Sequence, residues 1–193
     1  MGRCAVSGAL EKTDVGKKAV FLDRDGVLNL PIVKNGSPYP PTRLEEFHLY
    51  PDALESCVSL KNAGFLLVVA TNQPDVGRGT QTQAVVEAMH DLLLRELPVD
   101  LVEVCYHGGS NYSQTCTCRK PLPGMLLSAA RKHEILLSES WMVGDRWRDV
   151  DCGRAAGCKT IFVQRGYAEK LKALPDYEVS SISEAAKLIL SAT

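Results

Sequence analysis

The sequence lacks long apolar runs and any strong excess of charge of one sign. Its longest unbroken apolar stretch, residues 65–70, is far shorter than the roughly 20 residues that a membrane-spanning helix needs. The apolar stretch near the amino terminus is broken by Ser7 and Gly8, so it is too brief for a signal-peptide core. We therefore expect a cytoplasmic protein with no membrane span.

Charge and aromatic content also argue against a nucleic-acid partner. The 193 residues carry a formal net charge of -1, and aromatic residues make up only 6% of them. Proteins that bind single-stranded nucleic acid use a basic groove with aromatic side chains on which bases stack. A small ligand, recognised by a few local groups, fits this composition better.

The length and composition predict one folded domain. Hydrophobic residues make up 45% and charged residues 23% of the chain, which are ordinary globular proportions. A chain of this size buries one adequate core, whereas two cores would each be small. We expect a flexible leader over residues 1–17, a single domain over residues 18–193, and a monomer.

Five short apolar runs predict strands that are buried on both faces. They cover residues 19–22, 65–70, 101–106, 141–143 and 160–163. Helical spacing of apolar residues occurs between the runs, at Leu54, Val58 and Leu60 and at Val85, Met89, Leu92 and Leu93, and further helices are predicted over residues 124–132, 148–156 and 182–190. This alternation indicates an α/β fold with a Rossmann-like parallel sheet and helices on both faces. Residues 31–43, with four of the ten prolines, are predicted to be an ordered loop.

Chemically active side chains follow the predicted strands, where a parallel sheet forms its ligand crevice. They are Asp23 and Asp25, Thr71 and Asn72, His107 and Lys120, and Asp145 and Asp149. Two close carboxylates beside a phosphate need a divalent cation, and oxygen ligands favour Mg²⁺. A calcium loop that begins at Asp23 is excluded, because Leu28 and Lys34 stand where Gly and Glu are required. Each aspartate alone could be a turn or helix cap.

A second set of ligands indicates zinc. Cys105-Tyr106-His107 and Cys116-Thr117-Cys118 supply three thiolates and one imidazole, the ligands of a closed structural zinc site. The alternative is a redox pair or incidental thiols. Arg119 and Lys120 directly follow the last ligand, so a zinc loop over residues 105–118 would also fix their position. The other cysteines, Cys4, Cys57, Cys152 and Cys158, are predicted to be reduced thiols.

Four motifs resemble those of haloacid-dehalogenase-type phosphatases. They are Asp23-Arg24-Asp25-Gly26, Thr71 after the second strand, Lys120, and Gly144-Asp145 with Asp149. The resemblance implies that Asp23 is a covalent nucleophile and that Asp25 is the general acid and base. It also implies that Thr71 and Lys120 hold the transferring phosphoryl group, and that Mg²⁺ is bound by Asp23, the Asp25 carbonyl and Asp145. Asp149 is expected to support the metal site or Lys120.

The segment Arg119-Lys120-Pro121-Leu122-Pro123-Gly124-Met125 after the zinc ligands resembles two branches of this family, the heptose-bisphosphate and the histidinol-phosphate phosphatases. Thr71-Asn72-Gln73 and Arg78-Gly79 are more similar to the heptose branch. That resemblance implies removal of the 7-phosphate from D-glycero-D-manno-heptose 1,7-bisphosphate. Arg78, Arg119 and Arg146 are candidates for the second phosphate, and Tyr39, Asn72 and Gln73 for other substrate contacts. No large insertion follows the first or second predicted strand, so we expect no large cap domain.

Three alternatives remain open from the sequence. A histidinol-phosphate phosphatase would need an acidic group for the ammonium ion of its substrate, and Asp75 could serve. A nucleic-acid end-processing phosphatase would need the basic groove described above, and the near-zero net charge and low aromatic content of this chain argue against one. A catalytically inert, zinc-stabilised interaction module is the third alternative, and the complete set of acidic residues argues against it.

Overall fold

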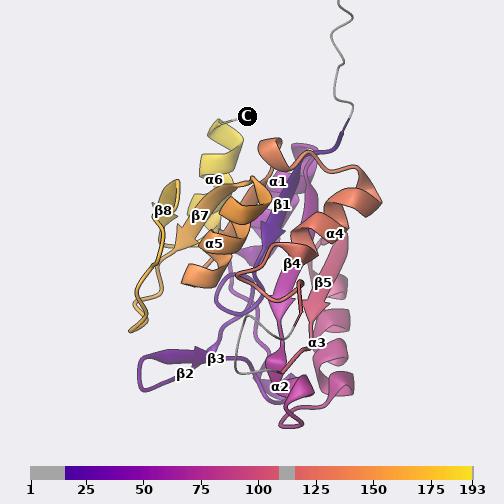
Figure 1. Cartoon of the computed structure of the whole chain (residues 1–193), viewed down its shortest axis with the longest axis vertical. Helices are drawn as coiled ribbons and strands as arrows, with labels where there is room; N and C mark the ends of the chain where they lie inside the picture. Colours follow the sequence, from indigo (N-terminus) through magenta and orange to yellow (C-terminus); the bar gives the residue numbers. More distant parts are fainter. Residues whose placement is uncertain (1–15, 109–115, 193) are drawn as a thin grey trace, which may run out of the picture.

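The computed structural model describes residues 16–108 and 116–192. Its main feature is a six-stranded parallel sheet in the order β5-β4-β1-β6-β7-β8 (Figure 1). The strands are β1 (Ala19–Leu22), β4 (Leu66–Asn72), β5 (Leu101–Cys105), β6 (Trp141–Gly144), β7 (Lys159–Val163) and β8 (Tyr177–Val179). The parallel sheet predicted from the apolar runs is confirmed.

Helices cover both faces of this sheet. Side chains of α1 (Ala53–Asn62), α3 (Gln83–Glu96) and α6 (Ile182–Ser191) share one apolar core with Val20 and Leu22 of β1. Side chains of α4 (Gly124–His133) and α5 (Trp147–Ala156) share a second core with Ala19 and Phe21. Because successive residues of a strand point to opposite faces, one short apolar run supplies both cores. Figure 1 shows α4 and α5 in front of the sheet.

Several elements differ from the predictions. β5 lies at the edge of the sheet and is only half-buried up to Cys105, so it is not covered on both faces. On α1, Leu54 and Val58 are exposed, and the helix instead buries Ala53, Cys57 and Leu60. The short strand β8 was not predicted, because its residues are mostly exposed and carry no apolar run.

The segment predicted to be a loop over residues 31–43 contains an antiparallel hairpin, β2 (Ile32–Lys34) and β3 (Ser37–Tyr39). Figure 1 shows this hairpin and the short helix α2 (Pro74–Gly77) at the lower end of the molecule, toward which the strands of the sheet run. Two 3₁₀ turns, η1 (Leu44–Glu46) and η2 (Leu137–Glu139), complete the elements. Among the described residues the segment after Asp23 is thus a small hairpin and not a large cap.

Residues 1–15 of the predicted leader lie outside the described residues, as does Cys4. Lys17, the last residue of the predicted leader, forms an isolated parallel bridge with Ile135. Its main-chain N–H donates to the Glu134 carbonyl at 2.9 Å, and its own carbonyl accepts from Leu136 at 2.9 Å.

Among the helices of the described residues, none combines the length and the apolar character needed to cross a bilayer.

Gly153 allows α5 to pack directly on the sheet. A Cβ atom at this position would lie 2.6 Å from Met142 Cβ and 2.7 Å from Thr160 Cγ2. We expect Gly153→Ala to lower the free energy of unfolding by about 1–3 kcal/mol, since the strained contact with a fixed strand outweighs the helix propensity of about 1 kcal/mol that alanine gains over glycine. Urea unfolding measures the change. Ala155→Ser, on the exposed face of the same helix, is the matched control, and a Gly153→Ala protein as stable as that control would contradict the expectation.

Candidate active site

A cleft of about 370 Å³ lies at the carboxyl ends of the central strands. Its walls come from the β2–β3 hairpin, the end of β4, the segment after the zinc ligands and the start of α5. Its lining residues are Asp23, Asp25, Ser37, Pro38, Tyr39, Pro40, Thr71, Asn72, Pro74, Asp75, Arg78, Arg119, Lys120, Asp145, Arg146, Arg148 and Asp149. The convergence of strand ends that the sequence predicted is therefore present.

Three buried carboxylates gather at the base of this cleft. Asp23 follows β1, where its N–H donates to the Val143 carbonyl of the neighbouring strand at 2.9 Å. Carboxylate oxygens of Asp23, Asp145 and Asp149 all lie within 4.8 Å of one another. Burial raises the pKa of Asp23 to about 6, although Lys120 opposes the shift. Burial, followed by the charges of Asp23 and Asp149, also raises the pKa of Asp145 well above its usual range.

Asp145 has the features of a cation ligand. It is 2% exposed, and among the described residues its carboxylate oxygens form no hydrogen bond of ordinary geometry, although the Tyr167 hydroxyl lies close to them. A buried, unpaired carboxylate is costly unless a metal or a donor compensates it. Gly26, with φ +93°, lets the chain pass close to this carboxylate, since a Cβ there would lie 1.8 Å from Asp145 Oδ2. The donor set of oxygens fits a hard cation such as Mg²⁺.

Lys120 lies between two of the carboxylates. Its Nζ is 2.9 Å from Asp23 Oδ1 and 2.6 Å from Asp149 Oδ1. Burial lowers the pKa of Lys120, but the charges of Asp149 and Asp23 outweigh that effect and raise it overall, so the ammonium stays charged. Asp149 Oδ2 accepts from the main-chain N–H of Arg146 at 3.0 Å. Both Asp149 oxygens are thus in use, which agrees with a supporting role for this residue.

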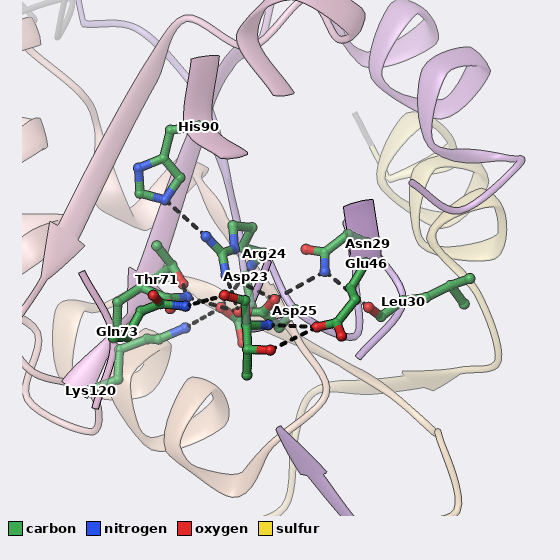
Figure 2. A network of polar contacts seen from close by, with 12 residues as sticks. Asp23, Arg24, Asp25, Asn29, Leu30, Glu46, Thr71, Gln73, His90 and Lys120 are labelled. Atoms are coloured by element: carbon green, nitrogen blue, oxygen red, sulfur yellow. Dashed lines mark hydrogen bonds and ion pairs between the residues drawn. The ribbon is translucent and has the colours of Figure 1, made fainter. Parts of the chain in front are cut away.

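The Asp25 carboxylate does not belong to this cluster of three, and it is held by side-chain donors (Figure 2). Arg24 Nη2 donates to its two oxygens at 3.0 and 2.9 Å. Asn29 Nδ2 donates to Oδ1 at 3.0 Å, and Gln73 Nε2 donates to Oδ2 at 2.8 Å. This carboxylate is fixed beside the acidic cluster rather than within it, so only the Asp25 main chain is left as a possible metal ligand.

The two residues at and after the end of β4, Asn72 and Gln73, position different residues of the site. Asn72 exchanges hydrogen bonds with the main chain of Lys120, with Nδ2 donating to the carbonyl at 3.0 Å and Oδ1 accepting from the N–H at 3.0 Å. Gln73 donates to Thr71 Oγ1 at 3.0 Å as well as to Asp25. Gln73 is 2% exposed and does not line the cleft. Its predicted contact with substrate has no support here, because its amide is used to position Asp25 and Thr71.

The predicted arginines and Tyr39 line the cleft, together with Arg148, which the sequence analysis did not single out. Arg78 donates to the Gly108 carbonyl at 3.0 Å and forms an ion pair with Asp75 at 3.1 Å. Arg146 forms an ion pair with Glu169, and Arg148 lies 3.6 Å from the same carboxylate. Cations from three segments of the chain therefore surround the cleft.

The four predicted zinc ligands converge away from the acidic cluster. Cys105 Sγ lies 3.4 Å from His107 Nδ1 and 3.6 Å from Cys116 Sγ, and Cys118 Sγ lies 3.3 Å from His107 Nδ1. All four ligand atoms are within 4.8 Å of one another. A tetrahedral site with Zn–S bonds of about 2.3 Å has S–S edges of about 3.8 Å, so the cluster fits a closed structural zinc. Residues 109–115 of the predicted zinc loop lie outside the described residues.

Hydrogen bonds join this cluster to the cleft. The Cys105 carbonyl accepts from Gln73 N–H at 2.8 Å. Arg119 donates its N–H to Cys116 Sγ at 3.3 Å and its Nη1 to the His107 carbonyl at 2.7 Å. Cys57, Cys152 and Cys158 are buried free thiols, and burial raises the pKa of each to about 12, which fits the predicted reduced thiols.

Comparison with known proteins agrees with this geometry. A family model described as HAD-hydrolase-like matches residues 117–185. The D-glycero-beta-D-manno-heptose-1,7-bisphosphate 7-phosphatase of Pasteurella multocida is 38% identical over 185 residues, which are 90% of this chain and 97% of the relative. The enzyme of the same name from Escherichia coli K12 is 37% identical over 158 residues, covering 77% and 80% of the two chains. The chain belongs to the haloacid-dehalogenase-like phosphatase family.

A solved structure of this family resembles the chain along most of its length. It is the D,D-heptose 1,7-bisphosphate phosphatase of B. bronchiseptica, complexed with magnesium and phosphate. Its TM-score is 0.78 at 32% sequence identity, with 91% of this chain and 99% of the other covered. The predicted family is confirmed, and the acidic cluster above is the part of the chain suited to a magnesium ion.

The sequence analysis gave no role to Arg24, Asn29, His90 or Arg148, which the structure brings to the candidate site. Arg24 is 0% exposed and connects Asp25 to His90 of α3. His90 had no local signal, because it stands on an apolar helix face, where histidines are usually core residues. Arg148 stands within the motif itself, directly before Asp149, and this place after β6 was a signal that could have found it.

The cysteine and histidine cluster predicts about one equivalent of zinc per purified chain by elemental analysis. We expect Cys118→Ser to lower both the zinc content and kcat, because Arg119 and Lys120 follow that ligand directly. Cys158→Ala is the control, since Cys158 is a buried thiol outside the cluster, and it should keep the metal. An active, magnesium-replete protein without zinc would contradict a structural zinc.

Proposed function

We propose that this chain is a Mg²⁺-dependent phosphatase that removes the 7-phosphate of D-glycero-D-manno-heptose 1,7-bisphosphate through an aspartyl-phosphate intermediate. The observation that carries the proposal is the buried acidic cluster of Asp23, Asp145 and Asp149 beside Lys120, at the base of an arginine-rich cleft. The names of relatives that match along most of the chain support the substrate.

In the first step, an Asp23 carboxylate oxygen attacks the phosphorus of the 7-phosphate, and the bond from phosphorus to the sugar oxygen breaks. Asp25 gives its proton to the departing sugar oxygen, which leaves as a neutral alcohol. Thr71 and Lys120 hold the oxygens of the transferring group, since their side chains lie beside Asp23 (Figure 2). The ammonium of Lys120 offsets charge that develops on those oxygens.

In the second step, water loses a proton to the Asp25 carboxylate and attacks the phosphorus of the aspartyl phosphate. The bond between phosphorus and the Asp23 oxygen breaks, which releases inorganic phosphate and restores both carboxyl groups to their starting states. Asp25 therefore needs a fixed position close to Asp23 in both steps. Its contacts with Arg24, Asn29 and Gln73 support that role.

Asp23, Asp145 and the main-chain carbonyl of Asp25 would hold the magnesium ion. When bound, Mg²⁺ neutralises the carboxylates and the phosphoryl oxygens, so that an anionic nucleophile can approach an anionic substrate. Asp145 is the best supported ligand, because its oxygens are buried in the acidic cluster and form no hydrogen bond of ordinary geometry among the described residues. Asp149 keeps Lys120 and the start of α5 in place.

The second phosphate of the substrate would bind the cations on the cleft wall. Arg78, Arg119 and Arg146 are the candidates, because guanidinium groups bind phosphate oxygens in pairs. Arg148 joins them as a fourth cation beside Glu169. Tyr39, which is 49% exposed on the hairpin, is placed to contact the sugar, and Asn72 fixes the Lys120 main chain at the cleft edge.

The phosphatase domain would extend over residues 18–193, with the zinc loop at residues 105–118 fixing one wall of the cleft. We propose that it acts as a monomer in the cytoplasm on a small sugar phosphate, without a nucleic-acid partner. The balanced net charge and the confined cleft support a small substrate.

The structure weakens the main alternative. A histidinol-phosphate phosphatase would need Asp75 for the substrate's ammonium ion, but Asp75 forms an ion pair with Arg78 at 3.1 Å. The Arg78 guanidinium beside it, with Arg119 and Arg146 lining the same cleft, would repel a second cation. An inert interaction module would have no need of a buried carboxylate cluster, which is costly to fold.

Replacement of the nucleophile tests the mechanism. We expect Asp23→Asn to lower Mg²⁺-dependent phosphate release by at least about 10³-fold, because an amide cannot form the covalent intermediate. The matched control is Asp91→Asn on the exposed face of α3, which should keep full activity. Unchanged phosphate release by the Asp23→Asn protein would disprove the mechanism.

A substrate comparison tests the specificity. With Mg²⁺ present, kcat/KM for heptose 1,7-bisphosphate should exceed that for histidinol phosphate by at least about 10²-fold, since only the bisphosphate carries a second anion for the arginines. Arg146→Gln should reduce this preference. If kcat/KM for histidinol phosphate equals or exceeds that for heptose 1,7-bisphosphate, the chain is better described as a histidinol-phosphate phosphatase.

A further inference from the structure

His90 of α3 contacts the proposed catalytic loop from behind. It is 6% exposed and lies on the apolar face of the helix, one turn after Val86 and next to Met89. Its Nε2 is 3.2 Å from Arg24 Nη1 (Figure 2). A polar group on such a face usually serves only the core, but this one is directed at the residue between the two proposed catalytic aspartates.

Arg24 connects His90 to Asp25. Its side chain is 0% exposed, with Nη1 on His90 and Nη2 on both oxygens of Asp25. The Phe47 ring lies 5.4 Å from the guanidinium carbon. A planar guanidinium that is fixed at two of its nitrogens has little freedom to rotate. Its contact with His90 therefore limits where the Asp25 carboxylate can lie.

His90 must be neutral to make this contact. Burial, and then the positive charge of Arg24, lowers the pKa of His90 to about 4. Arginine has only donors, so Nε2 has to supply a lone pair and Nδ1 has to carry the proton. A protonated imidazole would instead place a second buried positive charge against Arg24.

We propose that His90 is a positioning residue for the general acid and base, acting through the chain His90 Nε2, Arg24 guanidinium and Asp25 carboxylate. The proposal rests on the function proposed above, because it requires Asp25 to transfer protons. His90 does not touch substrate. It keeps Arg24 rigid, so that Asp25 is aligned with the leaving oxygen.

The proposal makes a specific kinetic demand. The value of kcat/KM covers the steps up to departure of the leaving group, where Asp25 acts as an acid. A sugar or other alkyl oxygen needs that proton, whereas p-nitrophenolate leaves readily without it. A misplaced Asp25 therefore lowers kcat/KM for an alkyl phosphate more than for p-nitrophenyl phosphate. General damage to the fold would lower both alike.

The experiment compares His90→Leu, His90→Gln and His90→Asn, with heptose bisphosphate and p-nitrophenyl phosphate as substrates. Glutamine can place an acceptor oxygen near the position of Nε2, whereas the shorter asparagine reaches only the position of Nδ1. The measured quantity is kcat/KM for heptose bisphosphate divided by kcat/KM for p-nitrophenyl phosphate. We expect this ratio to fall by about 10- to 100-fold in the leucine and asparagine variants. Glutamine should restore most of the ratio. If His90→Leu does not fold, the two amide variants alone decide.

His48→Gln is the matched control, since His48 is exposed, and it should leave the ratio unchanged. A ratio that is the same in all His90 variants would overturn the proposal. Nitrogen-15 NMR of the four histidines, with the His90 signal assigned by its loss in His90→Gln, gives a readout without catalysis. A proton on Nε2 would overturn this inference alone, whereas a wild-type protein that releases no phosphate from any ester would overturn the proposed function.

Discussion

The burial of three carboxylates around one ammonium group is the constraint on which the rest of the site depends. Asp23, Asp145 and Asp149 lie within 4.8 Å of one another, and Lys120 bonds only the first and the last of them. Desolvated like charges repel strongly, so a cluster with one cation keeps an excess of negative charge. A divalent cation held by Asp145 would offset that excess beside Lys120. The cost of burying the cluster and its affinity for magnesium thus have the same origin.

Short parallel strands make this cluster possible. β1, β4 and β6 are adjacent in the sheet and end at the same edge, so side chains far apart in sequence meet without long loops. The two apolar cores lie behind this edge and hold the strand ends at fixed separations. Such rigidity matters because proton transfer and in-line attack tolerate errors of only about 1 Å. The β2–β3 hairpin adds one wall to the cleft, whereas the acidic residues follow the ends of the strands.

Sequence patterns predicted the residues whose signal is local. Asp23 and Asp25 follow an apolar run, and the zinc ligands have a characteristic spacing, so both could be found by reading along the chain. Gln73 shows the limit of that approach. It lies one residue beyond the end of β4, and its partner Asp25 is 48 positions away. The contact of His90 with Arg24 spans 66 positions and depends on how α3 packs on the sheet, which no local pattern contains.

The two predicted metal sites are linked through the end of β4. Gln73 bonds the Cys105 carbonyl with its main chain and Asp25 with its side chain, and Asn72 bonds the main chain of Lys120, two residues after the last zinc ligand. Arg119, which stands between Cys118 and Lys120, donates hydrogen bonds to Cys116 and to the His107 carbonyl. A zinc ion that fixes the four ligands would therefore fix Lys120 from one side while Asn72 fixes it from the other. Ordering a loop costs conformational entropy, and binding of zinc during folding supplies free energy for it before any substrate arrives. Such a division of roles accounts for a thiolate cluster beside a site built on oxygen ligands: zinc would order the backbone, and magnesium would serve the chemistry.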